Sequence, residues 1–163
     1  MSTKKLTLIL AACAMLAVGF AADASAVEKQ PVRNWWGFRG GYSSSPDQIV
    51  LGGMMELGKP WGKASVVPSL DLGLGDNVTV WAGNLDLRWY LIPMPESGVD
   101  FYGAAGPSLV HYSVDGGGSG SELGLSLSAG ARIPSGNNRY NIETRFGVGD
   151  IPDFRLMVGY LFR

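Results

Sequence analysis

Apolar and polar residues alternate along most of the chain, and the alternation is clearest close to its C-terminus. There Phe154, Leu156, Val158, Tyr160 and Phe162 occupy every second position. A β-strand sends successive side chains to opposite faces, so this segment predicts a strand with one wholly apolar face. Aromatic residues stand at both ends of that face.

Seven further segments show the same period of two and are separated by clusters of glycine, proline, serine, asparagine and aspartate, which favour turns. They cover residues 35–42, 48–58, 65–74, 79–91, 99–114, 122–133 and 140–148. Glycine recurs every few residues, with 24 in the chain, and helix signals are few. The sequence therefore predicts an all-β domain of eight strands.

Two of these segments are less regular than the rest. Pro68 has no amide proton, so a bulge or a local break in the hydrogen-bond ladder is expected beside it. The facing of segment 99–114 is ambiguous. We favour an apolar side made of Phe101, Ala105, Pro107 and Leu109, and a polar side that contains Asp100, Tyr102 and Ser108.

The N-terminus has the organisation of a secretory signal peptide. Two lysines precede an almost continuously apolar run over residues 6–22, and Ala24-Ser25-Ala26 has the small-x-small pattern of a cleavage site. Leu10-Ala11-Ala12-Cys13 resembles a lipoprotein lipobox, but the residues after Cys13 stay apolar, which favours cleavage after Ala26. An uncleaved membrane anchor is the alternative, although the run is short for one.

The predicted organisation is therefore a signal peptide at 1–26, a short lead-in at 27–34 and one β-domain at 35–163.

The composition of the chain argues against several functions. With 13 basic and 14 acidic residues, no strong positive charge draws the chain to nucleic acid. The only cysteine lies in the predicted signal peptide, which leaves the mature domain without disulfides or thiol chemistry. With one histidine and dispersed carboxylates, we expect no metal and no cofactor.

Alternation alone does not say which face of the strands points outward. In a soluble, lipocalin-like barrel the apolar face is the core, whereas in a membrane barrel it contacts lipid. The strands are long enough to cross a bilayer when tilted. If the strands run up and down, aromatic residues gather near the two rims of the apolar face, as expected for girdles at the two water–lipid boundaries. The girdle residues are Trp36, Trp89, Phe101, Tyr140, Tyr160 and Phe162 at one rim and Tyr42, Trp81 and Phe154 at the other.

The opposite face carries five carboxylates and five guanidiniums but no lysine. These residues are Arg39, Glu56, Asp71, Asp86, Arg88, Glu122, Arg132, Glu143, Arg145 and Arg155. A solvated outer face normally contains lysine, whereas a narrow lumen can hold charges only as hydrogen-bonded ion pairs. The planar guanidinium suits such pairs with carboxylates. The sequence therefore favours a membrane barrel whose lumen is plugged by a charge network.

Taken together, these features resemble those of the small outer-membrane β-barrel proteins of Gram-negative bacteria, such as the OmpA-type transmembrane domain. The resemblance rests on the signal peptide, the eight strands, Gly-Phe-Arg-Gly-Gly-Tyr at 37–42, the segment 83–90 and the terminal Tyr160-Leu161-Phe162. It implies a monomeric, eight-stranded up-and-down barrel that lies in the outer membrane, contacts lipid and lipopolysaccharide, and is inserted by the outer-membrane assembly machinery. Arg163 departs from the family pattern, which usually ends on the aromatic residue.

The best catalytic candidate is formed by His111, Ser113 and Glu122, predicted to lie near one rim on neighbouring strands. A histidine paired with a carboxylate can activate a serine for acyl transfer. This grouping resembles the His-x-Ser pair and glutamate of outer-membrane lipid A deacylases, but Val114 stands where their motif has asparagine. The facing also argues against it, because His111 and Ser113 are expected on the lipid side and Glu122 on the lumen side.

From the sequence we expect a non-enzymatic outer-membrane barrel that serves envelope integrity or surface interaction. A lipid A-modifying acyl hydrolase, a small channel and a soluble periplasmic binder are the alternatives. Eight strands enclose a lumen that side chains can fill, which argues against a channel. The predicted outer turns are short, which argues against an adhesin that depends on long loops.

Overall fold

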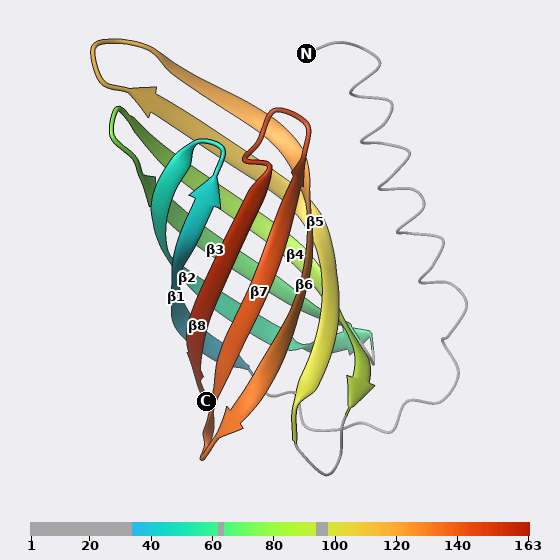
Figure 1. The fold of residues 1–163 in the computed structure, drawn as a ribbon. Coiled ribbons are helices and arrows are strands. Elements are labelled where there is room, and N and C mark those ends of the chain that lie inside the picture. The colour runs from blue at the N-terminus through green and yellow to red at the C-terminus, as the bar shows by residue number, and fades with distance from the viewer. Residues whose placement is uncertain (1–33, 62–63, 94–97) are drawn as a thin grey trace. The chain divides into compact units, whose positions relative to one another are not determined.

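Eight antiparallel strands close into one β-barrel in a computed structural model of the chain (Figure 1). The strands are β1 (Trp35–Ser44), β2 (Asp47–Trp61), β3 (Ala64–Leu74), β4 (Val78–Pro93), β5 (Asp100–Val114), β6 (Ser119–Ser135), β7 (Asn138–Val148) and β8 (Phe154–Phe162). Each strand pairs with the next in sequence, and β8 pairs with β1. The prediction of an all-β, eight-stranded up-and-down barrel is confirmed.

The structure describes residues 34–61, 64–93 and 98–163. The predicted signal peptide, its cleavage site and the lead-in up to residue 33 lie outside the described residues. Among the described residues, no helix is long and apolar enough to cross a membrane.

The barrel begins and ends at the same end, because Trp36 of β1 pairs with Phe162 of β8. We call this the terminal end, and the opposite one the far end. Four connections lie at the far end, at residues 45–46, 75–77, 115–118 and 149–153. The hairpin of β5 and β6 reaches beyond the others there (Figure 1).

The apolar face of the strands points outward, and the charged face points into the barrel. On the outer wall Phe38 is 64% exposed and Ile49 is 66% exposed, whereas inside the barrel Arg88 and Glu143 are each 1% exposed. This distribution is the reverse of that in a soluble barrel, which buries its apolar residues. The soluble, lipocalin-like alternative is therefore inconsistent with the fold.

The facing favoured for β5 is also confirmed. Tyr102 and Ser108 are buried in the lumen, whereas Phe101 and Leu109 are exposed on the outer wall. Beside Pro68 the β2–β3 pairing is interrupted, since it runs to Met54–Ser69 and resumes at Leu57–Val66. The register is unchanged across this gap, so the ladder has a local break there and no bulge. The irregular register lies further along, between Leu57 and Trp61.

Two clusters of buried apolar side chains lie towards the two ends of the lumen. Met54, Val67 and Leu161 form a buried cluster against Trp35 at the terminal end. A second cluster at the far end contains Val80, Ala82, Val110 and Ile151. Between these clusters the interior is mostly polar and charged, although the fully buried Met157 lies beside Glu143.

Candidate functional site: the ion-paired lumen

Every strand contributes a charged side chain to the interior, because the polar face of each strand points into the barrel. Six arginines and five carboxylates form a continuous chain of ion pairs, which we call the lumen network. Its members are Arg39, Glu56, Asp71, Asp86, Arg88, Asp100, Arg132, Arg139, Glu143, Arg145 and Arg155.

Glu143 on β7 lies at the centre of the lumen network. Its carboxylate accepts hydrogen bonds from the guanidiniums of Arg39 at 3.3 Å, Arg88 at 3.0 Å and Arg145 at 2.9 Å. Tyr102 donates a further hydrogen bond to Glu143 at 2.8 Å, and the Arg88 guanidinium stacks 3.9 Å from the centre of the Tyr102 ring. Four groups from β1, β4, β5 and β7 therefore converge on one buried carboxylate.

The Tyr102 ring fits because the facing position on β6 is a glycine. A Cβ atom at Gly130 would lie 2.5 Å from the Tyr102 hydroxyl oxygen and 2.4 Å from the carbonyl oxygen of Ile142. Both distances are shorter than a Cβ atom tolerates, so the absence of a side chain at Gly130 makes room for the ring.

Towards the terminal end, Glu56 on β2 collects the next set of donors. It accepts hydrogen bonds from Arg132 at 2.8 Å, Arg88 at 3.2 Å and the Ser65 hydroxyl at 2.7 Å, and also from the Tyr90 hydroxyl. The Arg132 guanidinium lies 4.3 Å from the centre of the Tyr90 ring. Both carboxylate oxygens of Glu56 thus accept hydrogen bonds from two donors each.

Asp100 extends the network to the terminal rim. It accepts hydrogen bonds from Arg132 at 2.9 Å and from Arg139 at 2.8 Å. Arg139 also lies over the Trp35 ring, with 5.4 Å between the guanidinium carbon and the ring centre.

Towards the far end, two aspartates hold the arginines of β1 and β7. Asp71 accepts a bidentate pair of hydrogen bonds from Arg39, at 2.8 Å and 2.7 Å. Asp86 accepts hydrogen bonds from Arg145 at 2.6 Å and from the Ser126 hydroxyl at 2.8 Å. Bidentate guanidinium contacts of this kind fix the geometry of both partners.

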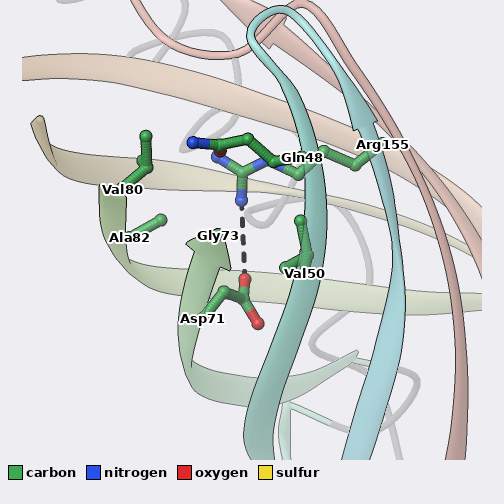
Figure 2. A pocket seen from close by; sticks show the side chains of 7 residues that line it. All are labelled: Gln48, Val50, Asp71, Gly73, Val80, Ala82 and Arg155. Carbon is green, nitrogen blue, oxygen red and sulfur yellow. Dashed lines mark hydrogen bonds and ion pairs between the residues drawn. The ribbon is translucent and has the colours of Figure 1, made fainter. Parts of the chain in front are cut away.

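Arg155 on β8 is held less closely than the other arginines. Its guanidinium reaches Asp71 at 3.5 Å, across a small cavity at the far end of the network (Figure 2). The cavity has a volume of about 10 Å³ and is lined by Gln48, Val50, Asp71, Gly73, Val80, Ala82 and Arg155. That volume is about what one water molecule needs.

Above this cavity, the connection between β7 and β8 folds into the mouth of the barrel. Ile151 is 5% exposed and packs against Val80, Ala82 and Val110. Tyr112 donates a hydrogen bond to the Asp150 carbonyl oxygen at 3.1 Å. The connection approaches Gly147 closely, because a Cβ atom there would lie 2.2 Å from the Pro152 carbonyl oxygen. The lumen is thus capped by apolar contacts above its ion pairs.

Nine of the ten charged residues predicted to face the lumen belong to the network. The tenth, Glu122, is half-buried near the far end and forms no ion pair with the described residues. It faces inward, since it pairs with the buried Val110, but it lies above the level of the arginines. Asp100, which the sequence placed on the polar side of its segment but not in the charge network, and Arg139, which lies just outside the predicted strand at 140–148, are also network members. Tyr102, which the sequence placed on the polar side of segment 99–114, faces the lumen and donates to Glu143, and Tyr90, on the same face of β4 as Arg88, donates to Glu56.

The candidate catalytic residues are not brought together. The His111 ring nitrogen Nδ1 lies 2.9 Å from the Ser121 hydroxyl oxygen, its cross-strand neighbour. Ser113 pairs with Ser119, and both His111 and Ser113 are exposed on the outer wall. Glu122 faces the lumen instead. A serine, a base and a carboxylate need direct hydrogen-bond contact to act as a triad, and this arrangement does not provide it.

The residues predicted to form girdles lie on the outer wall at two levels. Trp36 stacks on Phe162 with 4.8 Å between the ring centres, and Tyr160 contacts both Phe162 and Tyr140, at 5.0 Å and 4.9 Å. These four lie near the terminal end, together with Trp89 and Phe101. Tyr42, Trp81 and Phe154 lie nearer the far end.

The described residues contain no group of three or more histidine, cysteine, aspartate or glutamate side chains placed to hold a metal ion. The lumen network instead pairs carboxylates with guanidiniums, which are donors only. Paired polar side chains therefore occupy most of the described interior.

The closed eight-stranded barrel, its apolar outer wall and its ionic interior define a β-barrel of the outer-membrane type. No protein-family model and no curated protein matches the chain. Several solved structures match the chain in fold. Neisserial surface protein A is 15% identical over 79% of this chain and 93% of its own, with a TM-score of 0.57. The Yersinia pestis outer membrane protein Ail, in a phospholipid bilayer nanodisc, is 13% identical over 80% of this chain and 99% of its own, with a TM-score of 0.52. At these identities the likeness concerns the fold.

Proposed function

We propose that this protein is an integral outer-membrane barrel that neither conducts nor catalyses, and that serves envelope integrity or surface interaction through its outer wall and its far-end turns. The observation that carries the proposal is the lumen network. Because eleven paired charges and two apolar clusters fill the interior, the surfaces left for function are outside the barrel.

The orientation follows from the position of the barrel termini. If the terminal end faces the periplasm, the four far-end connections face the cell exterior. Each of them carries or borders on an exposed aspartate, and none of these described connections contains lysine or arginine. The aspartates are Asp47, Asp76, Asp115, Asp150 and Asp153. A partner at the cell surface would therefore meet carboxylates on short turns.

The outer wall supports insertion in a bilayer. It exposes leucine, isoleucine, valine and aromatic side chains on all eight strands. In water such a wall would be an aggregation surface far larger than the apolar patches of soluble proteins. In a membrane the same wall contacts acyl chains, while strand pairing around the closed barrel leaves no open sheet edge toward the lipid.

Membrane fractionation combined with heat-modifiable gel mobility tests insertion. We expect the protein in the outer-membrane fraction, extractable only with detergent, and with faster mobility before boiling than after. Recovery as a monodisperse protein in detergent-free periplasmic extract would contradict the proposal.

Planar-bilayer recording tests the closed lumen. We expect no discrete conductance steps from the purified protein, and regular steps of uniform size would instead indicate a channel.

An assay of acyl-chain release from lipopolysaccharide tests the hydrolase alternative. We expect no release above that of a Ser113→Ala variant, and release that depends on Ser113 would indicate an enzyme.

A further inference from the structure

The hairpin of β5 and β6 leaves one strand edge open at the far end. Strand β6 pairs with β5 from Ser119 onward, but its pairing with β7 begins only at Leu125, opposite Val148. Strand β7 leaves the ladder at Gly149, whose φ of +108° is a left-handed conformation that favours glycine. Residues 119–123 of β6 therefore have a neighbouring strand on one side only. We call this segment the β6 edge, and it belongs to the hairpin that reaches beyond the other strands (Figure 1).

The β6 edge presents backbone hydrogen-bonding groups on its open side. In an antiparallel ladder, opposite residues alternate between hydrogen-bonded pairs and pairs whose backbone groups point outward. At the turn of the hairpin, the Val114 N–H donates to the carbonyl oxygen of the opposite Gly118 at 2.9 Å. Counting along the register from this pair directs the backbone groups of Ser119, Ser121 and Leu123 away from β5. Among the described residues, no backbone hydrogen bond joins these three to the β7–β8 connection.

The hairpin is held in place by contacts that leave this edge uncovered. Tyr112 of β5, opposite Gly120, packs against the apolar cluster at the mouth of the barrel and donates a hydrogen bond to the Asp150 carbonyl oxygen at 3.1 Å. On the outer side, the His111 ring nitrogen Nδ1 lies 2.9 Å from the Ser121 hydroxyl oxygen. Neither contact uses the backbone groups of the β6 edge. A strand that adds there meets a preformed ladder, which lowers the ordering cost of binding.

We propose that the β6 edge binds an extended, basic peptide segment of a partner protein at the cell surface, which pairs with it as an additional strand. The inference deepens the proposed function, because it names the surface and the class of partner for surface interaction. Main-chain hydrogen bonds of an added strand supply affinity, and its side chains at alternate positions supply specificity. Recognition of this kind needs no long loop.

The position of the β6 edge fits the proposed membrane location. Ser121 stands in the same row of the outer wall as the girdle residue Trp81, since both pair with His111. The next row towards the turn consists of hydroxyl side chains, those of Thr79, Ser113 and Ser119. Open sheet edges do not occur in the hydrocarbon of a membrane. The row of hydroxyls beyond the girdle places this edge on the water side, where a soluble partner can reach it.

The charge around the β6 edge selects a basic partner. Glu122 lies within the edge, faces inward and forms no ion pair with the described residues. The two connections that border the hairpin, 115–118 and 149–153, carry aspartates and no lysine or arginine. A residue opposite Glu122 on an added strand has its side chain on the same face, so a lysine or arginine there pairs with the carboxylate. An inward-pointing charge also blunts an edge against other strands, so Glu122 disfavours neutral and acidic segments.

A second copy of this chain fits the β6 edge poorly. The strands of a membrane barrel are tilted by about 35–45°. A two-fold axis along the membrane normal, which relates two copies in one membrane, reverses the tilt of the facing strands. Two β6 edges would therefore cross at about 70–90° and could not align into a ladder. A free segment can adopt the tilt of β6.

Binding of labelled synthetic peptides to the detergent-purified, heat-modifiable barrel tests the inference. The probe is a nine-residue peptide that alternates lysine and threonine, and fluorescence anisotropy measures its affinity. If the lysines face Glu122, the threonine N–H groups point at the edge and the lysine N–H groups point away from it. We expect N-methylation of the threonines to weaken binding at least tenfold, whereas N-methylation of the lysines, the matched control, leaves it within about threefold. A peptide with glutamate in place of lysine should bind at least tenfold more weakly.

Variants of the barrel test the same contacts from the other side. Ser121→Pro removes an outward N–H from the edge without removing a hydrogen bond between β5 and β6, and it should weaken binding at least tenfold. Ser119→Pro serves if this variant does not fold. Ser121→Ala is the matched control, because it loses the hydroxyl contact with His111 but keeps the N–H, and it should bind like the wild type. Glu122→Gln should reduce the preference for the lysine peptide several-fold, while Asp47→Asn, at the start of β2 across the ring of strands, should not.

Several outcomes would overturn the inference. Equal binding of the two N-methylated peptides, or unchanged binding by both proline variants, would show that attraction to the aspartates does not involve an added strand. Preference for the glutamate peptide would contradict the charge assignment, and a dimer that is lost in Ser121→Pro would make a second copy the occupant. If an inserted, heat-modifiable barrel binds no peptide, only the β6 edge assignment fails. If the protein is not inserted in the membrane, the proposed function fails as well.

Discussion

The middle of the lumen and its far end hold their charges in different ways. In the middle, Glu143 meets three guanidiniums within 3.3 Å and a tyrosine hydroxyl at 2.8 Å. At the far end, Arg155 reaches only Asp71, at 3.5 Å, and Asp71 is already paired with Arg39 through two shorter hydrogen bonds. The network has one more arginine than carboxylates, and Arg155 is the arginine with the longest contact.

This difference shows where the barrel depends on its charges. Taking charges out of water costs free energy, which the ion pairs recover only when the geometry is good and every group has a partner. Around Glu143 several guanidiniums share one carboxylate, so that removing the carboxylate affects all of them. Arg155 borders a cavity with room for about one water molecule. Its loss leaves no carboxylate without a donor, because Asp71 keeps its two hydrogen bonds from Arg39.

The largest effect is expected from Glu143→Gln. The substitution preserves the shape of the side chain but leaves Arg39, Arg88 and Arg145 with less negative charge around them. Leaving a buried charge uncompensated costs about 3–5 kcal/mol. Urea titration of the barrel refolded in detergent micelles, followed by heat-modifiable mobility, measures the free energy of unfolding. Glu122→Gln, outside the network, is the control and should change stability by less than about 0.5 kcal/mol. Equal effects in the two variants would show that the central ion pairs do not support the barrel.

An intermediate effect is expected from Gly130→Ala. The added Cβ atom would meet the Tyr102 hydroxyl and the Ile142 carbonyl oxygen, so the ring must move away from Glu143. Overpacking of this kind costs about 1–3 kcal/mol. The same urea titration measures it. Gly83→Ala is the matched control, because a Cβ atom there has no neighbour within 4 Å. A stability loss of the same size in both variants would mean that the loss at Gly130 does not come from crowding of Tyr102.

The smallest effect is expected from Arg155→Gln. Asp71 keeps its bidentate pair with Arg39 and a hydrogen bond from Asn84 at 3.1 Å, so no carboxylate becomes uncompensated. We expect a change in the free energy of unfolding of no more than about 1 kcal/mol. Arg88→Gln, which removes a donor from both Glu56 and Glu143, should cost several times more. If Arg155→Gln were the more harmful of the two, the far end would be the part of the lumen that the barrel depends on.

The polar phase of each strand was readable from the sequence, but the partners within the lumen were not. Arg39 and Glu143 are 104 residues apart and Arg132 and Glu56 are 76 apart, so only closure of the barrel brings them together. Glu122 shows the same limit. Its phase correctly placed it inside, but its height in the barrel depends on the stagger between β5 and β6, which put it above the arginines.

The candidate triad failed for a reason that was partly visible in the sequence. His111 and Ser113 occupy positions of β5 that were expected to face lipid, whereas Glu122 occupies a position of β6 that was expected to face the lumen. The exact register, with His111 opposite Ser121 and Val110 opposite Glu122, came only from the structure. The ion pairs of Asp100 and Arg139 were not predicted because both residues lie at strand ends, where alternation is least regular: Asp100 was assigned only to the polar side, and Arg139 lay outside the predicted strand.

The sequence by itself determined the number of strands, the apolar and polar faces, and the choice of arginine over lysine for the interior. These are local properties, because a period of two assigns each side chain to a face without any reference to its partners. Only the tertiary structure decided which charges pair and where the far-end cavity lies. Those features depend on the stagger of neighbouring strands around a closed barrel, which joins residues far apart in the chain.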